Sequence, residues 1–169
     1  EFVGCKGAFV SNELNNFQIK QIKAPANFEL HYSIYHPISL MTSRQCFFQT
    51  INSCGKDQMD GNCMTECSKS AEITDLNNQS FLIKKTGGNY NEIFHETHFL
   101  NLDIIGDIQD RFSGYMVDLR DIETKTKLHV DKTKLIQLFL NAVSIKSGAE
   151  DELRKQINNT SFSQYSKGI

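Results

Sequence analysis

The sequence has no long apolar run and no excess of charge of one sign. None of its apolar stretches approaches the roughly 18 residues that a membrane-spanning helix needs. Its 169 residues carry a net charge of −2, so no overall basic field attracts nucleic acid, although a local basic patch is compatible with this balance. The hydrophobic content of 39% and the charged content of 22% are typical of a globular chain. One domain of ordinary size is therefore expected.

The first residues, EFVGCKGAFVSNEL, have neither an initiator Met nor the charged-then-apolar pattern of a signal peptide. We therefore expect a fragment of a longer protein from a reducing cytoplasm. The chain has five cysteines, whereas a secreted disulfide scaffold of this size would usually carry an even number. The reducing compartment and the odd number of cysteines both disfavour disulfides. A Ser-His-Asp pattern, a phosphate-binding loop and internal repeats are also missing.

The first third of the chain predicts a parallel strand–helix–strand unit. Residues 7–11 form a short apolar run that is typical of a buried strand. Apolar residues recur with helical spacing over residues 14–22, and Pro25 ends that helix. Residues 28–34 alternate with period two and predict a second strand. Two strands joined by a helix at this length pair in parallel.

The rest of the chain predicts alternating strands and helices after a cysteine-rich loop without clean periodicity. Strands are expected at residues 80–84, near 93–94 and at 114–120, with a turn at Gly87-Gly88 and a short helix after Phe99. Asp131 is a good N-cap for a helix. The apolar face of that helix comprises Leu135, Leu138, Phe139, Ala142 and Val143. A last short helix is expected over residues 150–157, and the polar tail from Asn158 is expected to fray.

Four of the five cysteines, Cys46, Cys54, Cys63 and Cys67, lie within 22 residues. Structural zinc sites need four ligands and usually contain a tight C-x2-C pair. Here the gaps are seven, eight and three residues. Iron–sulfur clusters also use four thiolates, and their spacings vary more widely. The spacing favours an iron–sulfur cluster, with zinc and unrelated thiols as the alternatives. Cys5 stands apart and is expected to be a buried structural thiol.

Two basic residues flank this block. Arg44 precedes Cys46 by two positions, and Lys56 follows Cys54 by two. Either side chain could stabilise thiolates or a reduced cluster. Solvation at the surface is the more common role for both.

Other candidate catalytic residues lie at predicted strand ends. Asp118 and Arg120 end the GYMVDLR strand, where their side chains point to one face, and His36 follows the FELHYSIY strand. Functional groups of parallel α/β sheets collect at such carboxyl ends. His95-Glu-Thr-His98 is one residue shorter than the zinc-protease motif H-E-x-x-H, so partly exposed histidines are expected there.

The order of these motifs resembles the collagenase-like peptidase family U32 over roughly residues 4–145. Cys63 follows Cys46 by 17 residues and Cys67 follows four later, which is the specific part of the resemblance. The other matching motifs are Ser11-Asn-Glu-Leu14, the strand ending at His36, Leu40-Met41, and Val117-Asp-Leu-Arg120.

The sequence departs from the family pattern at several positions. Ser39 stands where many relatives have a cysteine, and Cys54 is extra and is the candidate replacement ligand. Asn12 replaces an Arg and Leu119 replaces a Gly, while His36 matches the position of the Gly in a His-Gly pair. These changes indicate a divergent branch or the second, C-terminal half-module of a large member.

The resemblance implies an α/β fold in which residues 1–40 are the final strand–helix–strand of a TIM-type barrel. A cysteine cluster segment (41–75), an α/β segment (76–157) and a flexible tail (158–169) would follow. Some family members resemble collagen-degrading peptidases. Others resemble oxygen-independent hydroxylases that act on tRNA or rRNA bases or on quinone precursors with a 4Fe-4S cluster. The resemblance thus implies a 4Fe-4S cluster, RNA or an electron-donor protein as partner, and the rest of a longer polypeptide. A peptidase and a non-catalytic module with a zinc-stapled loop are the alternatives.

Overall fold

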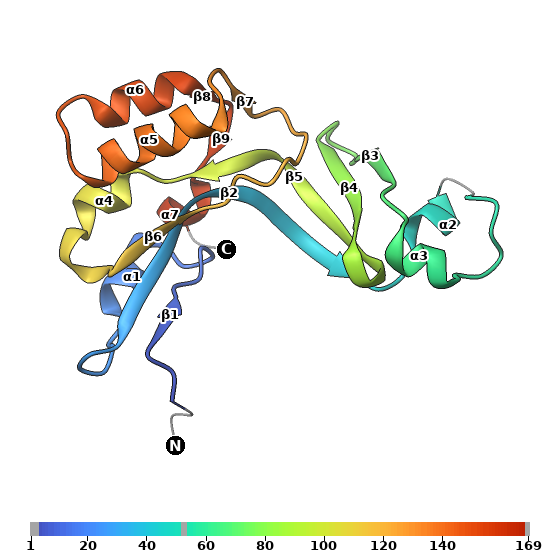
Figure 1. Ribbon diagram of the computed structural model, residues 1–169, viewed down its shortest axis with the longest axis horizontal. Helices are drawn as coiled ribbons and strands as arrows, with labels where there is room; N and C mark the ends of the chain where they lie inside the picture. The colour runs from blue at the N-terminus through green and yellow to red at the C-terminus, as the bar shows by residue number, and fades with distance from the viewer. Residues whose placement is uncertain (1–3, 52–53, 168–169) are drawn as a thin grey trace. The chain divides into compact units, whose positions relative to one another are not determined.

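The computed structural model describes residues 4–51 and 54–167 and shows a mixed α/β fold with a multi-stranded sheet. The described chain divides into two compact units (Figure 1). The first unit contains residues up to 36, 98–121 and those from 126 onward, and the second contains 37–97 and 122–125. Strands β2 (Glu29–Ser43) and β5 (Tyr90–Leu100) contribute residues to both units.

The predicted parallel strand–helix–strand unit is confirmed. Strand β1 (Gly7–Phe9) pairs in parallel with β2, and helix α1 (Asn16–Gln21) connects them. A capping box at Asn15 begins α1, because the Asn15 and Gln18 side chains each accept from the other residue's backbone N–H. Strand β6 (Gly114–Val117) also pairs with β2 in parallel.

Strand β2 is longer than the sequence predicts. It has 15 residues and continues beyond residue 34, through the buried Pro37. Proline lacks the N–H that a central strand donates, so it normally indicates the end of a strand. His36 therefore lies inside β2 and not after it.

The core of the first unit lies under helices α5 (Lys132–Val143) and α6 (Ala149–Gln156), which pack side by side (Figure 1). Asp131 caps α5 as predicted, since its carboxylate accepts from the Lys134 N–H at 2.9 Å. The predicted apolar face of α5 is buried, except that Val143 is half-buried. Strands β7 (Lys127–Leu128) and β8 (Ile157–Asn158) pair in antiparallel orientation.

The short helix expected after Phe99 is α4 (Asp103–Asp107), followed by the 3-10 turn η2 (Gln109–Arg111). The C-terminal segment, expected to fray, contains strand β9 (Thr160–Ser161) and helix α7 (Ser163–Lys167). Strand β9 pairs in parallel with His98 and Phe99 of β5. Tyr165 is buried and donates a 2.9 Å hydrogen bond to Asp107. Burial and the neighbouring Asp107 raise the pKa of Tyr165. These contacts pack the segment against β5 and α4.

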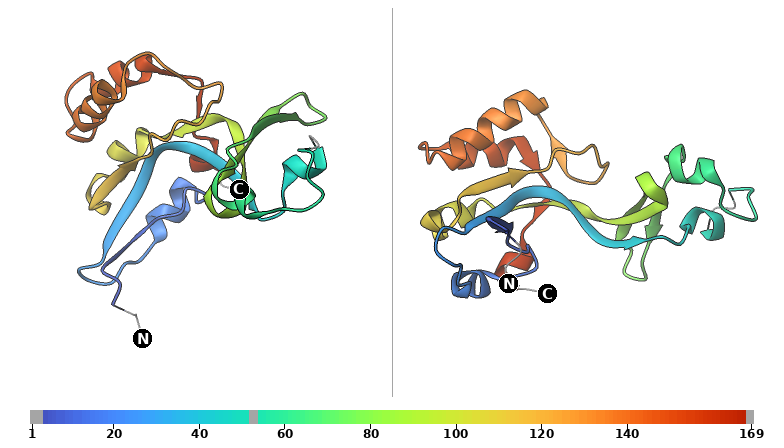
Figure 2. Two further views of the ribbon diagram at one scale, coloured as in Figure 1. Left: turned by 45° about the vertical axis from the view of Figure 1, so that its right-hand side comes forward. Right: turned by 60° about the horizontal axis from the view of Figure 1, so that its bottom comes forward.

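The second unit is an antiparallel sheet with two short helices. Strands β3 (Ser70–Thr74) and β4 (Ser80–Thr86) lie side by side in both views of Figure 2, and β4 pairs with β5 after the 3-10 turn η1 (Gly87–Asn89). The cysteine segment, predicted as a loop, includes helices α2 (Phe47–Ile51) and α3 (Gly61–Thr65). Strand β3 was not predicted. The core of this unit is Cys46, Phe48 and Ile83 with Phe47, Ala71, Ile73 and Ile93.

The described strands form an open sheet and do not close into a barrel. The predicted division of the chain into residues 1–40, 41–75, 76–157 and 158–169 stays a prediction. No helix among the described residues is long and apolar enough to cross a membrane.

The cap of α5 gives a direct test of this description. Asp131→Ala removes the acceptor for the Lys134 N–H, so we expect the free energy of unfolding to fall by about 1 kcal/mol. Urea denaturation followed by circular dichroism would measure the change. Asp131→Ser keeps a side-chain oxygen at the cap and should lose much less. Equal losses in the two variants would contradict the capping role.

Candidate functional site

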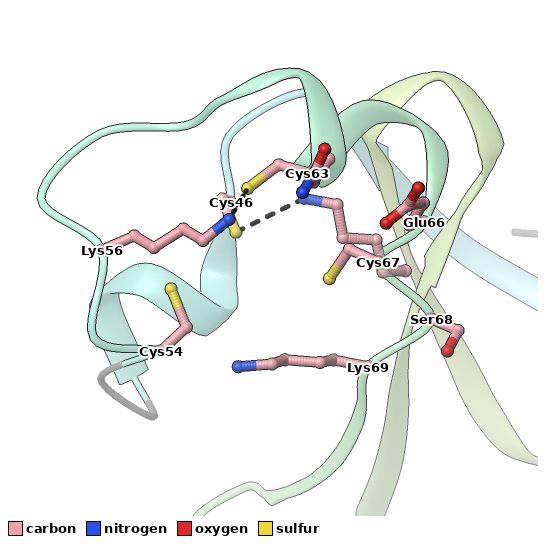
Figure 3. Close-up of a pocket in the computed structure, with 10 residues that line it drawn as sticks. Cys46, Cys54, Lys56, Cys63, Glu66, Cys67, Ser68 and Lys69 are labelled. Carbon is pink, nitrogen blue, oxygen red and sulfur yellow. Dashed lines mark hydrogen bonds between the residues drawn. The ribbon is translucent and has the colours of Figure 1, made fainter.

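All four cysteines of the dense block line one pocket of about 350 Å³ in the second unit (Figure 3). Their sulfur atoms are directed into the same space between the loop and the helices of this segment. The structure thus places all four cysteines on the wall of one pocket, and their role as ligands stays a prediction. The remaining lining residues are Lys56, Asn62, Glu66, Ser68, Lys69 and Lys85.

A buried amide positions the first of these cysteines. The Asn91 side chain is 0% exposed, and its Nδ2 donates to the backbone carbonyls of Gln45 at 2.8 Å and Ser43 at 3.4 Å. These bonds fix the chain immediately before Cys46. Cys46 and Phe48 then pack on Ile83 of β4 as the core of this unit. Cys46 is therefore held both by the backbone and by packing.

Helix α3 positions the last two cysteines. Asp60 is its N-cap, and its carboxylate accepts from the Cys63 N–H at 3.0 Å. The Cys67 N–H donates to the Asn62 carbonyl at 3.1 Å, which closes the last turn. Cys63 is buried, whereas Cys54 and Cys67 are half-buried. The pocket therefore has a buried side and a side open to solvent.

The Lys56 ammonium bridges a carboxylate and a thiol. Its Nζ donates to Asp60 at 2.6 Å and to the Cys63 sulfur at 3.8 Å. The hydrogen bond from Lys56, followed by the one from the Cys63 N–H, lowers the pKa of Asp60 to about 2. The same bond to Asp60 raises the pKa of Lys56. Lys56 thus contacts the site as the sequence allowed, although its side chain stays 41% exposed.

Lys85 is a pocket residue that the sequence analysis missed. Its side chain is only 3% exposed, and its Nζ donates to the Cys46 sulfur at 3.7 Å. The signal was present in the strand pattern, because Lys85 is two positions after the buried Ile83 and so shares its face. Arg44 behaves differently: it is exposed and donates to the Tyr90 hydroxyl at 2.8 Å, with its guanidinium 5.2 Å from the ring centre.

Within residues 4–51 and 54–167, no three His, Cys, Asp or Glu side chains lie close enough together to hold one metal ion. The thiols are instead distributed along the pocket walls. Cys5 lies outside this site, as predicted. It is exposed, however, so the prediction of a buried thiol is wrong. The reason is its position just before β1, a short strand whose own residues are largely exposed.

The first unit contains the weaker catalytic candidates. The half-buried His36 ring stacks on Phe99 with centroids 4.9 Å apart and contacts the Asn12 amide. Asp118 and Arg120 lie just after β6 and form an ion pair of 2.8 Å. Tyr35 of β2 is paired with Val117 of β6 in the parallel register. His36 comes directly after Tyr35, and Asp118 comes directly after Val117, so the two residues lie at the same level of adjacent strands.

His95 and His98 do not form one site. Both lie on β5, where side chains three positions apart point to opposite faces. His95 contacts the Gln79 amide at 3.0 Å, whereas His98 is buried and shares a 2.7 Å hydrogen bond with the Tyr35 hydroxyl. His98 was expected to be partly exposed, but its ring packs against the Tyr35 ring with centroids 5.5 Å apart and is buried. Burial, together with the negative charge of Asp118, raises the pKa of Tyr35 to about 12.

The chain was compared with protein families, curated proteins and solved structures. The family model described as peptidase family U32 matches residues 1–168. No curated protein and no solved structure matched.

The Lys56–Asp60 contact predicts a measurable pH dependence. The folded-state pKa of Asp60 is about 2, below the ordinary value of 3.8, so the contact stabilises the fold above pH 3.8 and this contribution is lost as the pH falls through about 2. Carboxyl NMR titration should give the low value. In Lys56→Met the pKa of Asp60 should rise toward 3.8, whereas in Lys69→Met the pKa of Asp60 should not change. An unchanged pKa in Lys56→Met would contradict the assigned cause.

Proposed function

Because the chain belongs to peptidase family U32, we propose that it is part of an enzyme whose Cys46, Cys54, Cys63 and Cys67 hold a 4Fe-4S cluster. The proposed reaction is the oxygen-independent hydroxylation of a nucleobase in tRNA or rRNA, or of a quinone precursor. The observation that carries the proposal is that four thiols and three lysines line one pocket.

The donor set suits an iron–sulfur cluster. Four thiolates are the usual ligands of such a cluster. A tetrahedral zinc site needs every sulfur about 2.3 Å from one point. A cluster has separate iron corners, so thiols on different walls of a pocket of about 350 Å³ suit it better. The ammonium groups of Lys56, Lys69 and Lys85 would offset the negative charge of four thiolates.

The residues of this chain would perform three tasks at the site. Asn91 and the core around Phe48 hold Cys46, and the capped helix α3 holds Cys63 and Cys67. Lys56 and Lys85 donate to sulfurs, and hydrogen bonds to sulfur are among the factors that set a cluster's potential. The cluster, when bound, would supply one-electron transfer.

The parallel strands of the first unit support a substrate-binding role at their carboxyl ends. We propose that β1, α1 and β2 are the last strand–helix–strand of a TIM-type barrel completed by other parts of a longer polypeptide. Asp118 and Arg120, just after β6, would then face the substrate, as expected at the carboxyl ends of barrel strands. His36 would join them from inside β2, because it lies at the level where β6 ends. RNA or an electron-donor protein would be the partner, in the reducing cytoplasm of a bacterial-type cell.

A peptidase is the second candidate, because the family description names that activity. The groups available for acid–base work in the first unit are the buried Tyr35–His98 pair and the nearby Asp118. A peptidase needs an activated nucleophile or a metal-bound water. Neither can be assigned among the described residues.

Metal analysis tests the cluster. We expect the protein purified without oxygen to contain iron and acid-labile sulfide in equal amounts. Cys54→Ser should lose most of both, because it removes one ligand, whereas Cys5→Ser should retain them. A chain with neither element, even after anaerobic reconstitution, would refute the cluster. Stoichiometric zinc without sulfide, with the fold lost on chelation, would support the zinc-stapled loop instead.

A peptide-hydrolysis assay separates the two enzyme classes. We expect no cleavage of a peptide panel that includes collagen sequences. Cleavage that Asp118→Asn abolishes and Cys54→Ser leaves intact would favour the peptidase. The Cys54→Ser variant is the matched control, since it affects only the proposed cluster.

A further inference from the structure

We propose that Lys85 is the positioning residue that sets the reduction potential of the cysteine site. The inference rests on the proposed cluster. It assigns to a side chain outside the four ligands the task of making one-electron reduction at this site easier.

Lys85 is fixed inside the second unit by the strand register. Residues Ile83 and Lys85 of β4 lie opposite Ile93 and Asn91 of β5, so these side chains share one buried face. The same face carries the core formed with Cys46. With a side chain 3% exposed, Lys85 holds its ammonium against the Cys46 sulfur on the buried side of the pocket.

The charge of Lys85 is balanced differently from that of the other two lysines of the pocket. Lys56 pairs with the carboxylate of Asp60, and Lys69 is exposed to solvent. Among residues 4–51 and 54–167, the only hydrogen-bond acceptor recorded for the Lys85 ammonium is the sulfur of Cys46 at 3.7 Å. A buried ammonium without an anion is costly. A metal-bound thiolate at Cys46 supplies the missing negative charge.

This arrangement has a redox consequence. One-electron reduction, with the electron delivered by a donor protein, adds one negative charge to the cluster and breaks no bond. A fixed positive charge beside a ligand sulfur stabilises the reduced form more than the oxidised form, and the effect is strong where water is excluded. Lys85 therefore raises the midpoint potential. Lys56 contributes less, because Asp60 already neutralises it and solvent screens it.

Replacing Lys85 by a neutral residue of similar length tests this role. We would reconstitute the chain anaerobically, titrate it with dithionite in the presence of mediators, and follow the reduced cluster by electron paramagnetic resonance. Lys85→Met should lower the midpoint potential at unchanged iron and sulfide content. Lys85→Arg keeps the charge and should stay near the wild-type value. Lys84→Met, on the opposite face of β4 and outside the pocket lining, is the matched control and should not shift it.

The outcomes separate the inference from the proposed function. A wild-type chain that never assembles a cluster overturns both. A wild-type chain with a cluster, and a Lys85→Met variant with the same midpoint potential, overturns only the role of Lys85. If Lys85→Met fails to fold, Lys85→Gln replaces it, and an unshifted potential in that variant is equally decisive. A midpoint potential that falls as far in Lys85→Arg as in Lys85→Met would also refute the charge-based role.

Discussion

The cysteine pocket depends on one buried amide. Asn91 of β5 donates to the backbone of Ser43 and Gln45, and so fixes where β2 ends and the cysteine segment begins. From that point Cys46 and Phe48 can reach Ile83 and form the small core of the second unit. The core in turn covers Lys85, which lies opposite Asn91 in the strand register. Loss of the Asn91 amide would leave the carbonyls of Ser43 and Gln45 without this donor. The segment before Cys46 would then be less firmly held, because a buried backbone carbonyl needs a donor.

The charges at the pocket form a gradient from the solvent inward. Lys69 is exposed, Lys56 is exposed but paired with Asp60, and Lys85 is buried beside a sulfur. Electrostatic effects strengthen as water is excluded, so the innermost lysine has the greatest effect on the thiols. Cys46 and Cys63 are the two buried cysteines, and each accepts a hydrogen bond from a lysine. Cys54 and Cys67 lie on the more open side, from which a cofactor or partner can approach.

The first unit supplies a different kind of site. Its three parallel strands, β1, β2 and β6, belong to a sheet that the described strands leave open. His36, inside β2, and Asp118, just after β6, each follow a residue of the Tyr35–Val117 pair and so lie at one level. Membership of peptidase family U32 is consistent with both regions, since it was the strand motifs and the cysteine spacing together that indicated the family.

The sequence alone determined the features that are local or compositional. Period-two alternation, the cap at Asp131 and helical spacing predicted most elements, and the cysteine density pointed to the segment that lines the pocket, because each signal lies within a few adjacent residues. Only the tertiary structure decided which side chains are buried. The continuation of β2 through Pro37, the buried His98 and the buried Tyr165 all depend on residues distant in the chain. Lys85 is the clearest case: strand alternation places it on the face of Ile83 and Lys84 on the other face, but only the tertiary structure brings the Cys46 sulfur to that face.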